Sequence, residues 1–185
     1  MNQIDIEKVV KNLIDTFINA GKISIELRNQ GLKKEIKSDN TPVSNGDIEV
    51  NTIVTKKIKE LTPNIPIVSE ETSENKSVSD LKDFWLIDPI DGTYDYINHL
   101  DEFTINAGLI VNNRPVAGLI YAPAKKRMFY SYGKGSAFEY KKNETINTSV
   151  NLEPEPQGDS DDYDSDDSDY SEGSSISDEE DFQSK

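Results

Sequence analysis

The change in composition near residue 152 constrains the fold of this chain more than any other feature of the sequence. Residues 153–185 hold 14 of the 35 acidic residues and one basic residue, Lys185. Apolar residues are too few there to offset the entropy of ordering the backbone, which costs about 1–2 kcal/mol per residue. We therefore predict a disordered acidic tail over 153–185. The fold must be built by residues 1–152, where 21 acidic and 19 basic residues nearly balance.

Several function classes are excluded or disfavoured by composition. The chain has no cysteine and a single histidine, His99, which excludes disulfides, thiolate metal sites and a multi-histidine zinc centre made by this chain alone. It has no apolar run long enough to span a membrane and no secretion signal at its start, so we expect a cytoplasmic protein. The negative charge of the tail argues against nucleic acid as its direct partner.

Two helices are predicted near the start of the chain. Over 4–29, apolar residues recur at three- and four-residue spacing, and Gly31 ends the pattern. The second helix has a capping box made by Ser44 and Asp47, which is followed by a single apolar stripe and closed by Pro63.

After the second helix the apolar pattern changes to that of short strands. Strands are expected over 65–68, 84–87, 103–111, 116–121, 127–132 and 136–140, with a weaker edge strand over 33–37. The Asn112–Pro115 segment is a predicted hairpin turn. Helices followed by strands with hairpin connections indicate an α+β fold, in which two helices pack on a largely antiparallel sheet.

Two of the predicted strands end in acidic residues. Glu70 and Glu71 follow the strand at 65–68, and Asp88 and Asp91 follow the strand at 84–87. If these strands are neighbours, the carboxylates meet at one edge of the sheet and repel one another unless a cation neutralises them. Magnesium is the expected cation, because it prefers hard oxygen ligands and shares them with substrate phosphates.

The residues between and after Asp88 and Asp91 fit the same chemistry. Pro89 stiffens the turn, Gly92 leaves room for a phosphate to approach the backbone, and Thr93 adds a hydroxyl. Taken singly, each acid could equally be a solvated loop residue or a helix cap.

The combination of these segments resembles the inositol monophosphatase superfamily. Trp85–Thr93 is similar to its signature, Ser69–Glu71 to its strand-end glutamate motif, and Thr41–Asp47 to its first motif. Glu102–Asn106 and Gly118–Ala124 resemble the 3'(2'),5'-bisphosphate nucleotidase (CysQ-type) branch. The resemblance covers residues 4 to about 152, and it implies the first half of a sugar-phosphatase-like α/β sandwich.

The resemblance implies a set of magnesium ligands. Glu70 would bind the metal and help to orient the attacking water. Asp88 would bridge two metals, the carbonyl of Ile90 would complete the first site, and Asp91 would ligate the second metal.

The resemblance also implies a phosphate-binding set and a catalytic set. Asp91, Gly92 and Thr93 would form the phosphate site, with the phosphate held on the amides of Gly92 and Thr93. The Thr93 hydroxyl, supported by Asp47, would polarise the attacking water.

The implied reaction is lithium-sensitive removal of the 3'-phosphate from adenosine 3',5'-bisphosphate, a small-molecule phosphate monoester. Inositol monophosphatase activity is an alternative, and so is a catalytically inactive binding module that acts through its acidic tail. No segment after residue 152 resembles the family's second half, which carries the last metal-binding aspartate. We therefore expect a shortened domain whose activity is in question, and whose site self-association or a second chain would complete.

Overall fold

The structure is a computed structural model that describes residues 5–37, 41–71, 81–133, 135 and 137–140. All of these residues belong to one compact unit, Met1–Leu152. The predicted acidic tail lies outside the described residues, so its disorder stays a prediction. Within the described part of the chain, no helix has the length and apolar character needed to cross a membrane.

Both predicted N-terminal helices are present. Helix α1 (Ile6–Gln30) starts after Asp5, whose carboxylate accepts a hydrogen bond from an amide of the first turn, and stops at Gly31, where φ is 98°. Helix α2 (Asn45–Leu61) starts after Ser44, as the capping box predicts. The two helices pack against each other.

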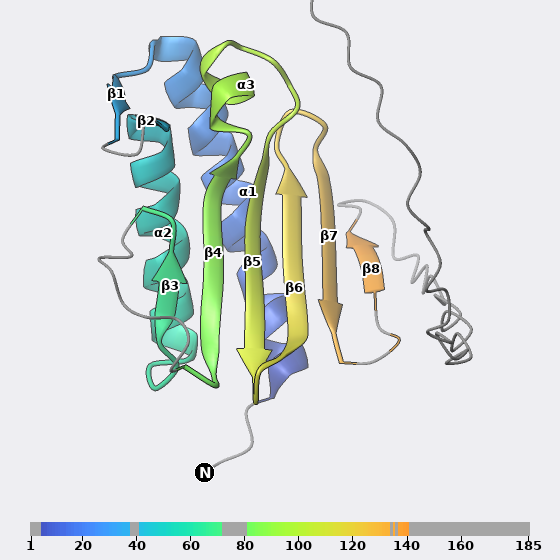
Figure 1. The fold of residues 1–185 in the computed structure, drawn as a ribbon. Helices are drawn as coiled ribbons and strands as arrows, with labels where there is room; N and C mark the ends of the chain where they lie inside the picture. The colour runs from blue at the N-terminus through green and yellow to red at the C-terminus, as the bar shows by residue number, and fades with distance from the viewer. Residues whose placement is uncertain (1–4, 38–40, 72–80, 134, 136, 141–185) are drawn as a thin grey trace, which may run out of the picture. The chain divides into compact units, whose positions relative to one another are not determined.

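The strands form a small pair and a six-stranded sheet (Figure 1). The pair is β1 (Lys34–Ile36) with β2 (Pro42–Ser44). The sheet has the order β3 (Ile67–Ser69), β4 (Phe84–Asp91), β5 (Thr104–Val111), β6 (Arg114–Ala122), β7 (Arg127–Tyr132) and β8 (Ala137–Tyr140). Its β3–β4 pair is parallel and its other pairs are antiparallel, which confirms a largely antiparallel sheet. A short helix, α3 (Thr93–Ile97), follows β4.

Helices α1 and α2 lie on one face of the six-stranded sheet and bury the core there (Figure 1). Trp85 of β4 is fully buried, and its indole N–H donates to the Thr62 hydroxyl at the end of α2 over 3.0 Å. The neighbouring residue on β4, Leu86, points to the other face and is 51% exposed. No described element covers that other face.

Three local features differ from the sequence prediction. Strand β2 is absent from the predicted strands, although it pairs with β1. Strand β4 continues beyond the predicted residue 87 to Asp91, with an irregularity of register between Asp88 and Asp91. The hairpin turn is confined to Asn112 and Asn113, which both have positive φ, and β6 begins directly after them.

Candidate metal and phosphate site

The acidic strand ends meet because β3 and β4 are parallel neighbours. Ile67 pairs with Trp85 and Ser69 with Ile87, and the Glu70 amide continues the ladder with a 3.2 Å hydrogen bond to the Ile87 carbonyl. The carboxyl ends of both strands therefore reach the same edge of the sheet, as the sequence predicted for neighbouring strands. The Ser69 hydroxyl donates to the Asn51 side chain of α2 over 2.7 Å and fixes the end of β3 against that helix.

Asp88 is the carboxylate in the most unfavourable surroundings. Its Oδ1 atom is buried and has no hydrogen-bond partner among the described residues. Burial, together with the negative charges of Glu70, Asp91 and Asp47, raises the pKa of Asp88 to about 7. Solvent reaches part of the Asp88 side chain, but the buried Oδ1 of an anionic Asp88 has neither a hydrogen-bond partner nor a counter-charge among the described residues, which is the condition that a bound cation relieves.

Lys37 is a residue of this site that the sequence did not single out. Its Nζ lies 3.0 Å from Oε1 of Glu70 and 2.8 Å from Oε1 of Glu71. The Glu71 side chain is only 7% exposed, and burial raises its pKa although Lys37 opposes that rise. An ammonium group between two carboxylates marks a position where positive charge is stabilised.

Asp91 has a different partner. Asn106 of β5 donates from its amide nitrogen to Oδ2 of Asp91 over 3.1 Å, and the Oδ1 atom of Asn106 is buried without a partner among the described residues. The pairing register of β4 with β5 shifts between Asp88 and Asp91. The sequence assigns no role to Asn106, which belongs to the branch motif Glu102–Asn106.

The N-terminus of α2 brings Asp47 to the same edge. Oδ2 of Asp47 accepts from the Ser44 amide (2.9 Å) and the Ser44 hydroxyl (2.6 Å), which closes the predicted capping box. Its Oδ1 atom accepts from the Thr93 hydroxyl over 2.9 Å. Asp47 is 1% exposed, so both of its oxygens are used inside the protein. The Thr93 hydroxyl also lies 2.9 Å from the Ile90 carbonyl oxygen.

Gly92 forms the turn between β4 and α3, and only glycine fits there. Its φ of 87° belongs to the left-handed region, and a Cβ atom would lie 2.8 Å from the carbonyl oxygen of Glu102. Gly92 is the N-cap of α3, and the first amides of a helix have no acceptor inside that helix. The amide N–H groups of Gly92 and Thr93 can thus donate hydrogen bonds to an anion.

The oxygen donors present at this edge of the sheet fit a magnesium ion. Among the described residues, no group of three or more carboxylate, imidazole or thiol side chains is already gathered tightly enough to hold a metal. The orphaned Oδ1 of Asp88, with Glu70 and Asp91 near enough to raise the Asp88 pKa, nevertheless supplies the hard oxygen donors that magnesium prefers.

The comparisons with known proteins bear on the family and the fold of this chain. A model of the inositol monophosphatase family matches residues 5–179. The 3'(2'),5'-bisphosphate nucleotidase CysQ of Haemophilus influenzae is 34% identical over 130 residues, covering 68% of this chain and 47% of that protein. This chain therefore spans about half the length of the curated relatives it matches.

Solved structures share the fold. The inositol monophosphatase of Thermotoga maritima superposes with a TM-score of 0.62 at 25% identity, covering 74% of this chain and 52% of that one. An inositol monophosphatase/NADP phosphatase solved with Mg2+ and phosphate gives a TM-score of 0.64 at 18% identity, with 72% and 51% covered. The family match over most of the chain and the shared fold lead to one conclusion: this chain belongs to the inositol monophosphatase family.

Proposed function

We propose that this chain carries the metal- and phosphate-binding part of a magnesium-dependent phosphomonoesterase, and that its substrate is adenosine 3',5'-bisphosphate. The observation that carries the proposal is the buried, unpartnered Oδ1 of Asp88 beside Glu70 and Asp91. A carboxylate in that position costs stability unless it serves a ligand.

The metal would be held by oxygen atoms from three places in the chain. Glu70 supplies a carboxylate from the end of β3, and Asp88 and Asp91 supply carboxylates from β4. The Ile90 carbonyl, already within reach of the Thr93 hydroxyl, supplies a fourth donor. Magnesium bound there would neutralise the phosphate oxygens and lower the pKa of a coordinated water.

The protein's own groups would orient the substrate and the attacking water. The amides of Gly92 and Thr93 receive phosphate oxygens at the turn into α3. The Thr93 hydroxyl donates a hydrogen bond to Oδ1 of Asp47. Its oxygen lone pairs can then accept a hydrogen bond from the attacking water. Glu70 accepts a second hydrogen bond from that water and fixes its direction of attack.

Lys37 would change partners when the metal binds. Its ammonium group now bridges Glu70 and Glu71. Glu70 would hold the metal, which would neutralise that carboxylate, and Lys37 would remain paired with the buried Glu71.

The choice of substrate rests on the CysQ relatives, which are called 3'(2'),5'-bisphosphate nucleotidases and are 31–39% identical to this chain. Inositol monophosphatase activity is the second candidate, favoured by the likeness to inositol monophosphatase structures. The chain spans about half of these relatives, so the activity and the substrate of the whole enzyme are proposals for this chain.

Phosphate release from adenosine 3',5'-bisphosphate by the purified chain tests the proposal. Release is expected with Mg2+, and it should stop with a chelator and fall when lithium is added. Inositol 1-phosphate should react more slowly. A rate that grows faster than in proportion to protein concentration would indicate that self-association completes the site.

A matched pair of threonine variants makes the test specific. Thr93→Val keeps the side-chain shape and should lower the rate about 100-fold, since a positioned proton-transfer group typically contributes at least that much. Thr52→Val removes an exposed hydroxyl on α2 and should leave the rate unchanged. Magnesium-independent release, or equal rates for the two variants, would contradict the proposal. A folded chain without any turnover would favour the binding-module alternative.

A further inference from the structure

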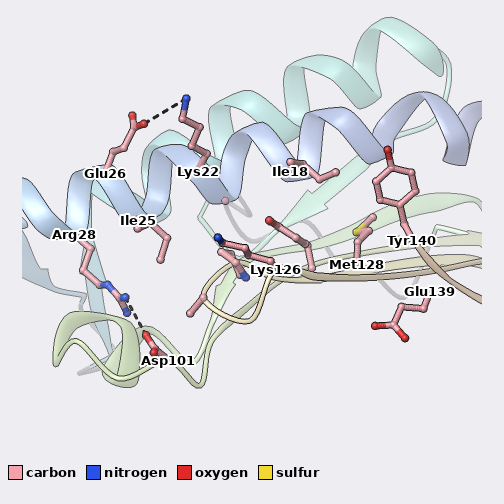
Figure 2. Close-up of a pocket in the computed structure, with 14 residues that line it drawn as sticks. Ile18, Lys22, Ile25, Glu26, Arg28, Asp101, Lys126, Met128, Glu139 and Tyr140 are labelled. Atoms are coloured by element: carbon pink, nitrogen blue, oxygen red, sulfur yellow. Dashed lines mark hydrogen bonds and ion pairs between the residues drawn. The ribbon is translucent and has the colours of Figure 1, made fainter. Parts of the chain in front are cut away.

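A cavity lies between α1 and the turn that joins β6 to β7 (Figure 2). Its volume is about 810 Å³, a size that accommodates a small organic molecule. None of the proposed metal- or phosphate-binding residues lines it. The cavity is therefore separate from the carboxylate edge and requires its own explanation.

The lining of this cavity has a charged part and an apolar part, and the apolar part includes two aromatic rings. Figure 2 shows Ile18 of α1 close to Met128 and Tyr140 on the strands, with Ile25 farther along the helix toward Arg28. Tyr121 of β6 also lines the space. Burial raises the pKa of Tyr121, so its ring is neutral at physiological pH and offers a flat apolar surface.

Gly21 sets how closely the turn approaches α1. A Cβ atom at Gly21 would overlap the Tyr121 ring and would lie 2.9 Å from Cγ of Pro123. The turn therefore packs directly on the helix backbone, and this packing forms the floor of the cavity. A larger residue at Gly21 would push the turn outward and open the floor.

The charges around the cavity leave one cation over. Lys22 pairs with Glu26 (3.7 Å), Arg28 pairs with Asp101 (3.0 Å), and Arg127 pairs with Glu139 (2.9 Å). These pairs account for the other charged residues of the lining.

The surplus cation is Lys126. Among the described residues its exposed side chain makes no hydrogen bond or ion pair, although Glu26 and Glu139 line the same cavity. Its backbone has a φ of 53°, a conformation that lysine rarely adopts. Lys126 thus places an unpaired ammonium group at the cavity while the turn bears a conformational cost.

Arg28 closes one end of the space. Its side chain is 9% exposed, and its two terminal nitrogens donate to the Leu100 carbonyl (2.7 Å) and to Asp101. Its Nε atom is buried and has no partner among the described residues. This end of the cavity is therefore held by hydrogen bonds, and the charge of Arg28 is balanced there by Asp101.

We propose that this cavity binds a small ring-bearing organic anion, with its single anionic group at Lys126 and its ring between Ile25 and Tyr121. The apolar walls select a ring over a sugar or an inorganic ion, and the surplus cation selects an anion over a neutral ring.

Titration of the 15N-labelled full chain with 2-naphthoate tests this site by nuclear magnetic resonance. Binding should shift the amide signals of Gly21, Ala124 and Lys126 and leave that of Gly92 in place. The neutral analogue 2-naphthalenemethanol should bind about tenfold more weakly, because it lacks the charge-assisted contact.

Two adjacent lysines provide matched variants. Lys126→Asn removes the surplus cation with a residue that tolerates left-handed backbone, and it should weaken naphthoate binding about tenfold. Lys125→Asn removes the same charge one residue earlier, from a side chain that pairs with Glu102 and does not line the cavity, and should change binding less than twofold. Lys126→Gly serves as a second variant that the turn accepts.

Three results would overturn the proposal: no amide shifts at naphthoate concentrations up to about 10 mM, shifts confined to residues elsewhere, or equal weakening by Lys125→Asn and Lys126→Asn. Equal weakening would mean that only the general positive charge of the turn attracts the probe.

Discussion

The two halves of the candidate site are built in opposite ways. On the α2 side, both oxygens of Asp47 are occupied by hydrogen bonds from Ser44 and Thr93. On the strand-end side, Oδ1 of Asp88 is buried without a partner, and burial and neighbouring charges raise the Asp88 pKa to about 7. Both are aspartates of the same small region, yet one is satisfied and the other is not.

The difference indicates that Asp47 stabilises the fold, whereas Asp88 is suited to binding a ligand. The Asp47 network is complete without metal, so its hydrogen bonds stabilise the native state directly. The Asp88 cluster destabilises the metal-free protein and recovers that free energy when a cation binds. The same site thus contains a preorganised part and an electrostatically strained part.

The largest change in stability should come from removing the Asp47 carboxylate, whose oxygens are both hydrogen-bonded. Asp47→Ala deletes the capping box and leaves the Ser44 amide and the Thr93 hydroxyl without their acceptor. We expect the free energy of unfolding to fall by about 2–4 kcal/mol, measured by urea denaturation. Asp15→Ala, at an exposed position of α1, is the control and should stay within about 0.5 kcal/mol of the wild type. Equal stability of the two variants would show that the hydrogen bonds of Asp47 do not stabilise the native state.

A change of opposite sign is expected at the unsatisfied carboxylate. Asp88→Asn keeps the shape of the side chain and removes its charge, so the metal-free protein should gain about 1 kcal/mol of stability in the presence of a chelator. Thermal melts with and without 10 mM Mg2+ should show stabilisation by the metal in the wild type and not in the variant. A lower melting temperature of Asp88→Asn in chelator would show that the charge of Asp88 does not destabilise the metal-free protein.

The contribution of Asp88 to stability should also depend on pH. The pKa of Asp88 is raised from 3.8 to about 7 by burial and by the charges of Glu70, Asp91 and Asp47. The native state therefore binds a proton that the unfolded state releases, and this contribution is complete below pH 4 and lost as the pH rises through 7. Because the cluster lies near solvent, the decrease in stability between pH 5 and pH 8 should be about 1 kcal/mol. Urea midpoints in chelator measure it, and Asp88→Asn should show a smaller decrease.

Local sequence signals predicted the parts of the site that local sequence builds. The Ser44–Asp47 capping box spans a single turn, so its spacing alone identified the start of α2. The apolar runs identified β3 and β4, and their acidic ends were expected to meet if the strands were neighbours, which the register confirms. The family signature placed Thr93 with Asp47, and the hydrogen bond between them is present.

The parts that escaped prediction depend on contacts between distant segments. Lys37 reaches Glu70 and Glu71 across more than 30 residues, and it belongs to a polar stretch that carries no periodic signal. Asn106 meets Asp91 only because β5 pairs with β4 in one particular register. The cavity at Lys126 likewise forms only when the β6–β7 turn packs on Gly21. Such contacts follow from the tertiary fold, and composition and spacing do not encode them.

The double use of Asp47 has a consequence for the order in which the site is assembled during synthesis. Thr93 follows Asp47 by 46 residues, so at about 5–20 residues per second the ribosome adds it roughly 2–9 seconds later. During that interval Oδ2 of Asp47 can already cap α2 through Ser44, because those partners lie within one helical turn. The start of α2 can therefore orient this carboxylate before Thr93, the residue that it supports, has been added to the chain.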